Sequence, residues 1–99
     1  MSVKRIVPNI QTDRLDASQE FYSGLLGLRV VMNMGWIITF ESPTSPHAQL
    51  SVIEKDPSGV HPDLTVEVDD VDEVYTRMLA RGVQIVYPPT DEPWGVRRF

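Results

Sequence analysis

The chain begins one structural pattern twice. An extended apolar segment, an acid-capped amphipathic helix ending at a glycine, and another strand occupy residues 3–31, and the same order returns at 61–86. Repeated modules of this kind bury their sheets only by pairing with each other. The repeat therefore predicts an α+β fold in which paired βαβββ modules form a curved mixed sheet around a cleft. We expect function to lie in that cleft.

The first unit contains a helix between strands. Asp16 stands where an N-cap is expected, Gln19 occupies the capping-box position, and Gly27 follows the helix as a C-cap. Apolar residues at helical spacing predict the buried stripe of this helix, which comprises Ala17, Phe21, Leu25 and Leu28. Strands are expected at residues 5–10, 28–32, 36–41 and 49–54. In the first of them, Ile6 and Ile10 share one face, and Val7 and Asn9 share the other.

The second unit begins after Asp56-Pro57-Ser58-Gly59, so we expect modules at about 3–56 and about 60–99 within one domain of residues 1–99. Residues 61–69 alternate as a strand, which places Leu64, Val66 and Val68 on a core face and Asp63, Thr65 and Glu67 on a wetter face. Asp70 and Glu73 form a capping box for a helix that ends near Gly82. A strand at 83–87 and the start of another at Val96 follow. The counterpart of residues 36–54 is absent, so we expect either that the sequence is part of a longer chain or that a partner subunit supplies the missing strand.

Composition narrows the class of function. Fourteen acids against nine Lys and Arg give a formal charge of -5, which disfavours nucleic acid because phosphate contacts need a basic face. The absence of Cys excludes disulfides, thiolate metal sites and a Cys nucleophile. No apolar run approaches the ~18 residues of a membrane span. We expect a cytoplasmic protein that contacts neither nucleic acid nor membrane.

Sequence motifs in both units resemble one superfamily. In the first unit, Phe21-Tyr22 followed by Leu25-Leu26-Gly27-Leu28 is similar to a stretch of the glyoxalase/bleomycin-resistance/extradiol-dioxygenase superfamily, also called vicinal oxygen chelate. In the second, Val66-Glu67-Val68-Asp69-Asp70-Val71-Asp72 and Pro89-Thr90-Asp91-Glu92-Pro93-Trp94-Gly95 also resemble it. The resemblance covers nearly the whole chain and implies a fold, while the substrate remains open.

The resemblance also implies where a metal ion would bind. Metal-dependent members hold one divalent ion with side chains from the first and last strands of each module. Transferred to this chain, those positions are Val7, approximately Ser51, Asp63, and a fourth beyond Phe99. Valine cannot coordinate a metal, and a serine hydroxyl is a poor ligand for a divalent transition ion. We therefore expect neither a metal nor another cofactor.

Six residues are candidates for ligand binding. Asn9, Asp63 and Glu67 are expected to form a polar, acidic floor, although plain solvent exposure is an equal alternative for the two acids. The two carboxylates are separated by about 13 Å of strand at ~3.3 Å per residue, which is too far to share a proton. Trp36, Phe40 and Trp94 are expected to stack on a flat cation, with a core or dimer-interface role as the alternative for Trp36. His47 and His61 fit solvated loop positions.

These observations predict a metal-free small-molecule-binding protein similar to the bleomycin-resistance branch, which sequesters a cationic or aromatic compound. The resemblance implies that subunits pair as homodimers to complete the clefts. One alternative is a divalent-metal-dependent lyase or dioxygenase of the same superfamily. Another is a regulatory or interaction domain that uses an exposed sheet edge. No G-x-S-x-G elbow or glycine-rich phosphate loop is present.

Overall fold

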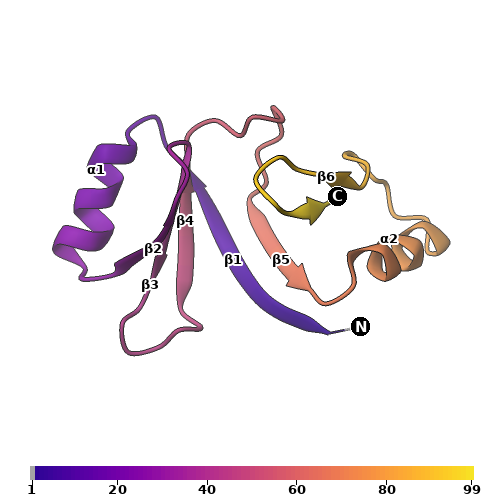
Figure 1. The fold of residues 1–99 in the computed structure, drawn as a ribbon, viewed down its shortest axis with the longest axis horizontal. Helices are drawn as coiled ribbons and strands as arrows, with labels where there is room; N and C mark the ends of the chain where they lie inside the picture. Colours follow the sequence, from indigo (N-terminus) through magenta and orange to yellow (C-terminus); the bar gives the residue numbers. More distant parts are fainter. Residues whose placement is uncertain (1) are drawn as a thin grey trace. The chain divides into compact units, whose positions relative to one another are not determined.

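The computed structural model describes residues 2–99. The elements in chain order are β1 (Val3–Gln11), α1 (Leu15–Gln19), η1 (Glu20–Leu25), β2 (Arg29–Asn33), β3 (Ile37–Glu41), β4 (Gln49–Ile53), β5 (Leu64–Val68), α2 (Val71–Ala80), β6 (Thr90–Asp91) and β7 (Arg97–Arg98). Five strands form one sheet in the order β2-β3-β4-β1-β5, and β6 pairs with β7 (Figure 1).

The large sheet is mixed, as the repeat predicts. β1 runs parallel to β4, whereas β3 runs antiparallel to both β2 and β4. A parallel pair needs a crossover connection, and here the helix and two strands between β1 and β4 provide it. Strand, helix and three strands thus form one βαβββ module within an α+β fold. The second module contains a first strand, β5, then the helix α2 and the short hairpin of β6 and β7.

Contacts between residues divide the chain into two compact units. One comprises Arg5–Val66, and the other comprises Glu67–Phe99 with the start of the chain through Lys4. These limits differ from the expected modules because β5 belongs to the sheet of the first module. Asn9 N–H donates to the Asp63 carbonyl at 2.8 Å across the β1 and β5 pair. The predicted module boundaries stay a prediction.

The core of the larger unit lies between its helix and one face of the sheet. Its buried centre is formed by side chains of β3 and β4, namely Ile38, Phe40 and Val52. Leu15, Tyr22, Leu28 and Leu50 pack around that centre. The Tyr22 and Phe40 rings lie 5.5 Å apart between centroids. We call this surface the helix side of the sheet.

The predicted N-cap of the first helix is wrong, and of its predicted buried stripe only Leu28 packs against the core. The helix begins at Leu15 after Arg14, without a side-chain cap, and Asp16 lies inside its first turn. From Glu20 to Leu25 the backbone is a π-helix, in which Leu26 N–H donates to the Phe21 carbonyl at 3.0 Å. The wider turn changes the spacing that the stripe assumed. Phe21 and Leu25 are consequently exposed.

Part of the helix side has no cover within the larger unit. Ile10 is the register partner of Val52, so it lies on this side, and by alternation Ile6 shares it. The exposed fractions of Ile6, Ile10, Leu64 and Val66 are 55%, 43%, 51% and 47%. We call these four residues the apolar strip. The predicted core role of Leu64 and Val66 is therefore wrong within this chain, because the helix packs on β3 and β4.

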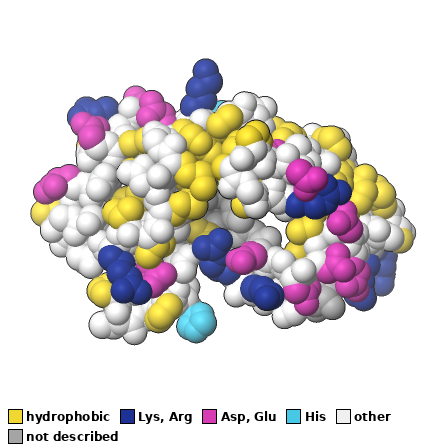
Figure 2. Space-filling view, in the orientation of Figure 1, with side chains coloured by type: hydrophobic (Ala, Val, Ile, Leu, Met, Phe, Trp, Pro, Cys, Tyr) yellow, Lys and Arg dark blue, Asp and Glu magenta, His cyan; other side chains and the backbone are white. Residues whose placement is uncertain are grey.

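In the second unit the predicted helix cap is confirmed. The Asp70 carboxylate accepts a hydrogen bond from Glu73 N–H at 3.0 Å, and the helix runs to Ala80. Gly82 has a φ of +74°, a left-handed conformation that glycine adopts readily after a helix. Acidic side chains gather over the part of the molecule that contains α2 (Figure 2). Asp72 and Glu73 lie in the first turn of α2, where negative charge stabilises the positive end of the helix dipole.

The predicted strand at 83–87 is wrong, because none of these residues pairs with a neighbouring strand. The chain instead forms the short hairpin of β6 and β7, in which Arg97 bridges Asp72 at 2.9 Å and Asp91 at 3.1 Å. Hydrogen bonds from the Arg97 guanidinium to Asp72 and then to Asp91 raise the pKa of Arg97 above its ordinary value. Within residues 2–99, no helix is long and apolar enough to cross a membrane.

Candidate functional site

Four polar side chains cross the sheet on the side opposite the helix. We call Thr39, Ser51, Asn9 and Thr65 the hydroxyl row. Thr39 Oγ1 and Ser51 Oγ lie 2.7 Å apart, and Asn9 Nδ2 donates to Thr65 Oγ1 at 2.8 Å. Ser51 is the register partner of both Thr39 and Asn9, which joins the two pairs into one line. Neighbours in register share a face of a sheet, so β3, β4, β1 and β5 each contribute one polar group.

Burial changes along the hydroxyl row. Thr39 and Ser51 are 3% exposed and Asn9 is 9% exposed, whereas Thr65 at the β5 end is exposed. A buried hydroxyl or amide is costly unless it is hydrogen-bonded, and these groups satisfy one another. The hydroxyl row therefore reaches solvent at its β5 end.

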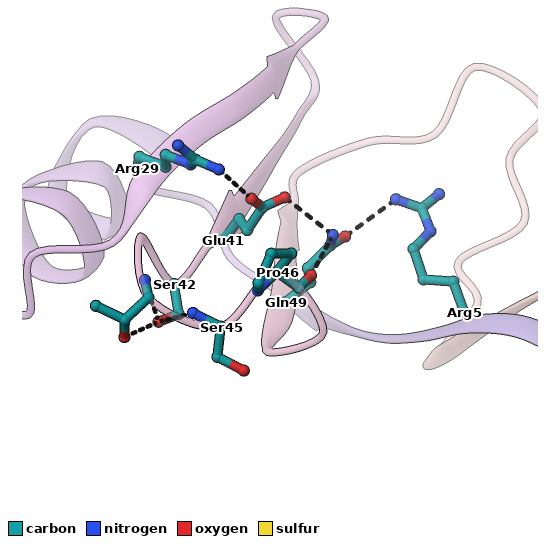
Figure 3. Close-up of polar contacts among 8 residues, drawn as sticks. Arg5, Arg29, Glu41, Ser42, Ser45, Pro46 and Gln49 are labelled. Atoms are coloured by element: carbon teal, nitrogen blue, oxygen red, sulfur yellow. Dashed lines mark hydrogen bonds and ion pairs between the residues drawn. The ribbon is translucent and has the colours of Figure 1, made fainter.

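A second line of polar groups runs beside the hydroxyl row on the same side. Figure 3 shows Arg29, Glu41, Gln49 and Arg5 linked in sequence from β2 to β1, and we call them the charged row. Arg29 bonds Glu41 at 2.5 Å, Gln49 donates to Glu41 at 3.1 Å, and Arg5 donates to Gln49 at 3.0 Å. Glu41 lies two residues from Thr39, and Gln49 two from Ser51, which places the rows on one face.

The structure brings two of the predicted site residues together. Asn9 on β1 and Asp63 before β5 are joined by their backbone hydrogen bond. Asp63 is exposed and directly precedes β5, two residues before Thr65. The polar floor expected from Asn9, Asp63 and Glu67 stays a prediction.

Phe40 does not lie on that floor. It is fully buried in the core beneath the helix, on the opposite side of the sheet from Thr39 and Asn9. A ring with no exposed surface cannot stack on a ligand, so its expected binding role is corrected to core packing. The physical cause is strand alternation, which turns Phe40 toward the helix.

The other three predicted residues are placed separately. Trp36 is half-buried and lies just before β3, an even number of residues from Phe40. Its backbone carbonyl accepts a hydrogen bond from Glu54 N–H at 2.8 Å. Glu67 is exposed and Trp94 is partly buried, and both belong to the smaller unit. His47 and His61 are exposed, as expected.

Trp94 has a cationic neighbour from its own chain. The Arg98 guanidinium carbon lies 5.2 Å from the Trp94 ring centroid and 5.4 Å from that of Tyr87. Tyr87 donates its hydroxyl proton to Glu92 Oε1 at 2.5 Å, and Arg98 Nη2 lies 3.5 Å from Glu92 Oε2. The stacking of Trp94 on a cationic ligand stays a prediction.

The side chains at the superfamily's metal positions do not fit a divalent ion. Val7 is aliphatic, and the Ser51 hydroxyl is buried against Thr39. Only Asp63 offers a carboxylate, and a single carboxylate is a weak site for a transition ion. Among residues 2–99, no three His, Cys, Asp or Glu side chains are grouped for metal binding.

Sequence reasoning missed Thr39, Thr65 and the charged row as parts of the site, and considered Ser51 only as a metal position. A signal was present. Thr39 lies between Ile38 and Phe40, and Ser51 between Leu50 and Val52, so each is a polar residue flanked by apolar residues in a strand. In such a strand the intervening polar residue faces the other side of the sheet.

The βαβββ order and the parallel pairing of β1 with β4 define a glyoxalase-type module. Residues 3–99 match the model of the Glyoxalase/Bleomycin resistance protein/Dioxygenase superfamily. The chain belongs to this superfamily. No curated protein matches the sequence significantly.

Two solved structures are similar to this chain. One, described as the NAD-dependent benzaldehyde dehydrogenase from Legionella pneumophila, has a TM-score of 0.70 and 20% identity, covering 91% of this chain and 82% of that chain. A bleomycin resistance determinant encoded on the transposon Tn5 has a TM-score of 0.38 and 19% identity, covering 92% and 81%. The first likeness concerns the fold alone.

Proposed function

We propose that this protein binds a cationic or aromatic small molecule without a metal, at the exposed end of the hydroxyl row. The observation that carries the proposal is the position of Asp63. Asp63 is exposed, and its backbone carbonyl accepts a hydrogen bond from Asn9 N–H at 2.8 Å, close to the Asn9 and Thr65 pair where the polar row reaches the surface. A carboxylate attracts a cation, while neighbouring amide and hydroxyl groups orient polar substituents. Trp36 stays a predicted contributor to binding in this unit, and the roles of Glu67 and Trp94, which belong to the smaller unit, stay separate predictions.

We also propose that the functional form is a homodimer. The apolar strip of β1 and β5 supports this, because four exposed aliphatic side chains on adjacent strands are suited to burial against another protein surface. We expect a second copy of this chain to cover the apolar strip, because the superfamily resemblance implies pairing of subunits.

The ligand proposal is tested with proflavine, a flat cation whose fluorescence reports binding, and with acridine as its neutral counterpart. Asp63→Asn is expected to weaken proflavine binding about two- to fivefold, which corresponds to the ~0.5–1 kcal/mol of an exposed ion pair. Binding of acridine should change little. Asp13→Asn removes an exposed charge in the same unit but outside the row, and is the matched control.

Equal proflavine affinity in wild type and Asp63→Asn would remove the electrostatic part of the proposal. The alternative function, a metal-dependent lyase or dioxygenase, is tested by elemental mass spectrometry of protein purified without chelator. One divalent ion per site would overturn the metal-free assignment.

A further inference from the structure

The hairpin of the smaller unit holds a charged side chain among aromatic rings and a buried acid. The guanidinium of Arg98 makes two ring contacts, with Tyr87 and Trp94, and one ion pair, with Glu92. We call Tyr87, Glu92 and Trp94 the cation cage. The Glu92 side chain is only 4% exposed. These three residues and Arg98 all belong to the smaller unit.

The chemistry of the cage is that of a receptor for a delocalised cation. Both rings lie within the ~6 Å range in which an aromatic face attracts a guanidinium. The Tyr87 hydroxyl donates a hydrogen bond to Glu92 Oε1 at 2.5 Å, and the other carboxylate oxygen, Glu92 Oε2, pairs with the cation. A carboxylate fixed in this way is oriented before the cation arrives, and such preorganisation lowers the entropic cost of binding.

The backbone of the hairpin sets the cage geometry. Glu92 N–H donates to the Val96 carbonyl at 2.7 Å, and Gly95 N–H donates to the Glu92 carbonyl at 3.0 Å. Gly95 adopts a φ of +96°, which is strained for residues with a side chain and closes the turn beside Trp94. Glu92 and Trp94 are therefore positioned by the turn, independently of the Arg98 side chain.

Arg98 is placed so that another cation can replace it. Its side chain is 26% exposed, although its Nε atom is buried. Its strand, β7, contains two residues and pairs only with the two residues of β6. Withdrawal of the Arg98 side chain does not require this pairing to break, because backbone groups form the ladder between the two strands.

We propose that Tyr87, Glu92 and Trp94 form a binding site for guanidinium-type ligands, which the chain's own Arg98 occupies until such a ligand competes. This site is separate from the hydroxyl row and does not rest on the function proposed for that row. The ligand class is a flat, delocalised cation, because planar guanidinium suits both ring stacking and a carboxylate.

The test is chemical complementation of an emptied cage. Ethylguanidinium is titrated in the millimolar range into wild type and Arg98→Ala, and the Trp94 indole N–H is followed by NMR at constant ionic strength. We expect saturable binding to Arg98→Ala that is about tenfold tighter than to wild type, because Arg98 no longer competes. The double variant Arg98→Ala with Glu92→Gln should lose most of this affinity.

Arg97→Ala is the matched control, since it removes the neighbouring arginine while leaving Arg98 in the cage. It should bind ethylguanidinium no better than wild type. Tetramethylammonium, which is cationic but not planar, should bind Arg98→Ala more weakly than ethylguanidinium does. Tighter binding of tetramethylammonium would contradict the assigned ligand class.

Folding of the variants is measured in parallel by thermal unfolding. If Arg98→Ala is unfolded, ethylguanidinium should refold it in a saturable way, and the double variant should not respond. Arg98→Met preserves side-chain length and is a second emptied cage. Lack of saturable binding or refolding in both Arg98→Ala and Arg98→Met, or equal binding to wild type and variants, would overturn the proposal.

Discussion

Asn9 on β1 donates a hydrogen bond to Thr65 on β5 at 2.8 Å, although the two residues are 56 positions apart in the chain. This bond links the first strand of the first module to the first strand of the second. It also holds the Asn9 amide at the point where the hydroxyl row emerges beside Asp63. The geometry of the candidate site therefore depends on this pair.

The Asn9 and Thr65 pair is expected to be energetically coupled. Thr65→Val should lower the free energy of unfolding by about 1–3 kcal/mol, because it leaves the largely buried Asn9 amide without this acceptor. Thr65→Ser keeps a hydroxyl and should cost less. A double-mutant cycle with Asn9→Ala, followed by chemical denaturation, measures the coupling. Additive effects of the two substitutions would show that the bond contributes nothing to stability.

Phe40 is expected to affect stability rather than ligand affinity. Phe40→Ala should destabilise the protein by about 3–5 kcal/mol, since it leaves a cavity beneath the helix. Phe40→Leu fills most of that space and should remain folded. Proflavine titration of Phe40→Leu is expected to match wild type, and a large loss of affinity in this folded variant would return Phe40 to the binding site.

Asp69 is expected to make stability depend on acid pH. A hydrogen bond from Ser2 N–H to Asp69 Oδ1 at 2.9 Å lowers the pKa of this carboxyl below its ordinary value of 3.8. Because the folded pKa is the lower one, the contribution to stability is present above the ordinary pKa and is lost as pH falls through the folded value. Carbon-detected NMR should find Asp69 titrating below 3.8. Asp69→Asn should flatten the acid limb of the stability profile, and a steep limb in that variant would rule out Asp69 as its source.

The apolar strip is expected to be buried between two copies of the chain. Leu64→Lys should weaken dimerisation more than tenfold, because a buried Leu contributes about 1.5–3 kcal/mol. Val83→Lys is the control, since Val83 is similarly exposed at 45% but lies in the other unit. Light scattering across a concentration series distinguishes the species. A wild-type protein that stays monomeric at high concentration would contradict the dimer.

Local sequence patterns were sufficient for much of the fold. The alternation of Val7 and Asn9 against Ile6 and Ile10, and the capping box of Asp70 with Glu73, each depend on neighbours within a few residues. The same is true of the second helix and of the strands through residue 68, whereas the N-cap and most of the buried stripe of the first helix were predicted wrongly. These features needed only side-chain period and capping chemistry, so the βαβββ order was predictable.

Tertiary structure decided which of these surfaces became a core and which became a site. Phe40 and Thr39 are adjacent in sequence, yet the helix buries one and leaves the other in the polar row on the opposite side. Leu64 and Val66 look like core residues by period, but the helix packs on β3 and β4 and does not cover them. Likewise, no local pattern pairs Arg98 with Trp94 and Glu92. Sequence period determines which face a side chain occupies, whereas long-range packing determines what covers that face.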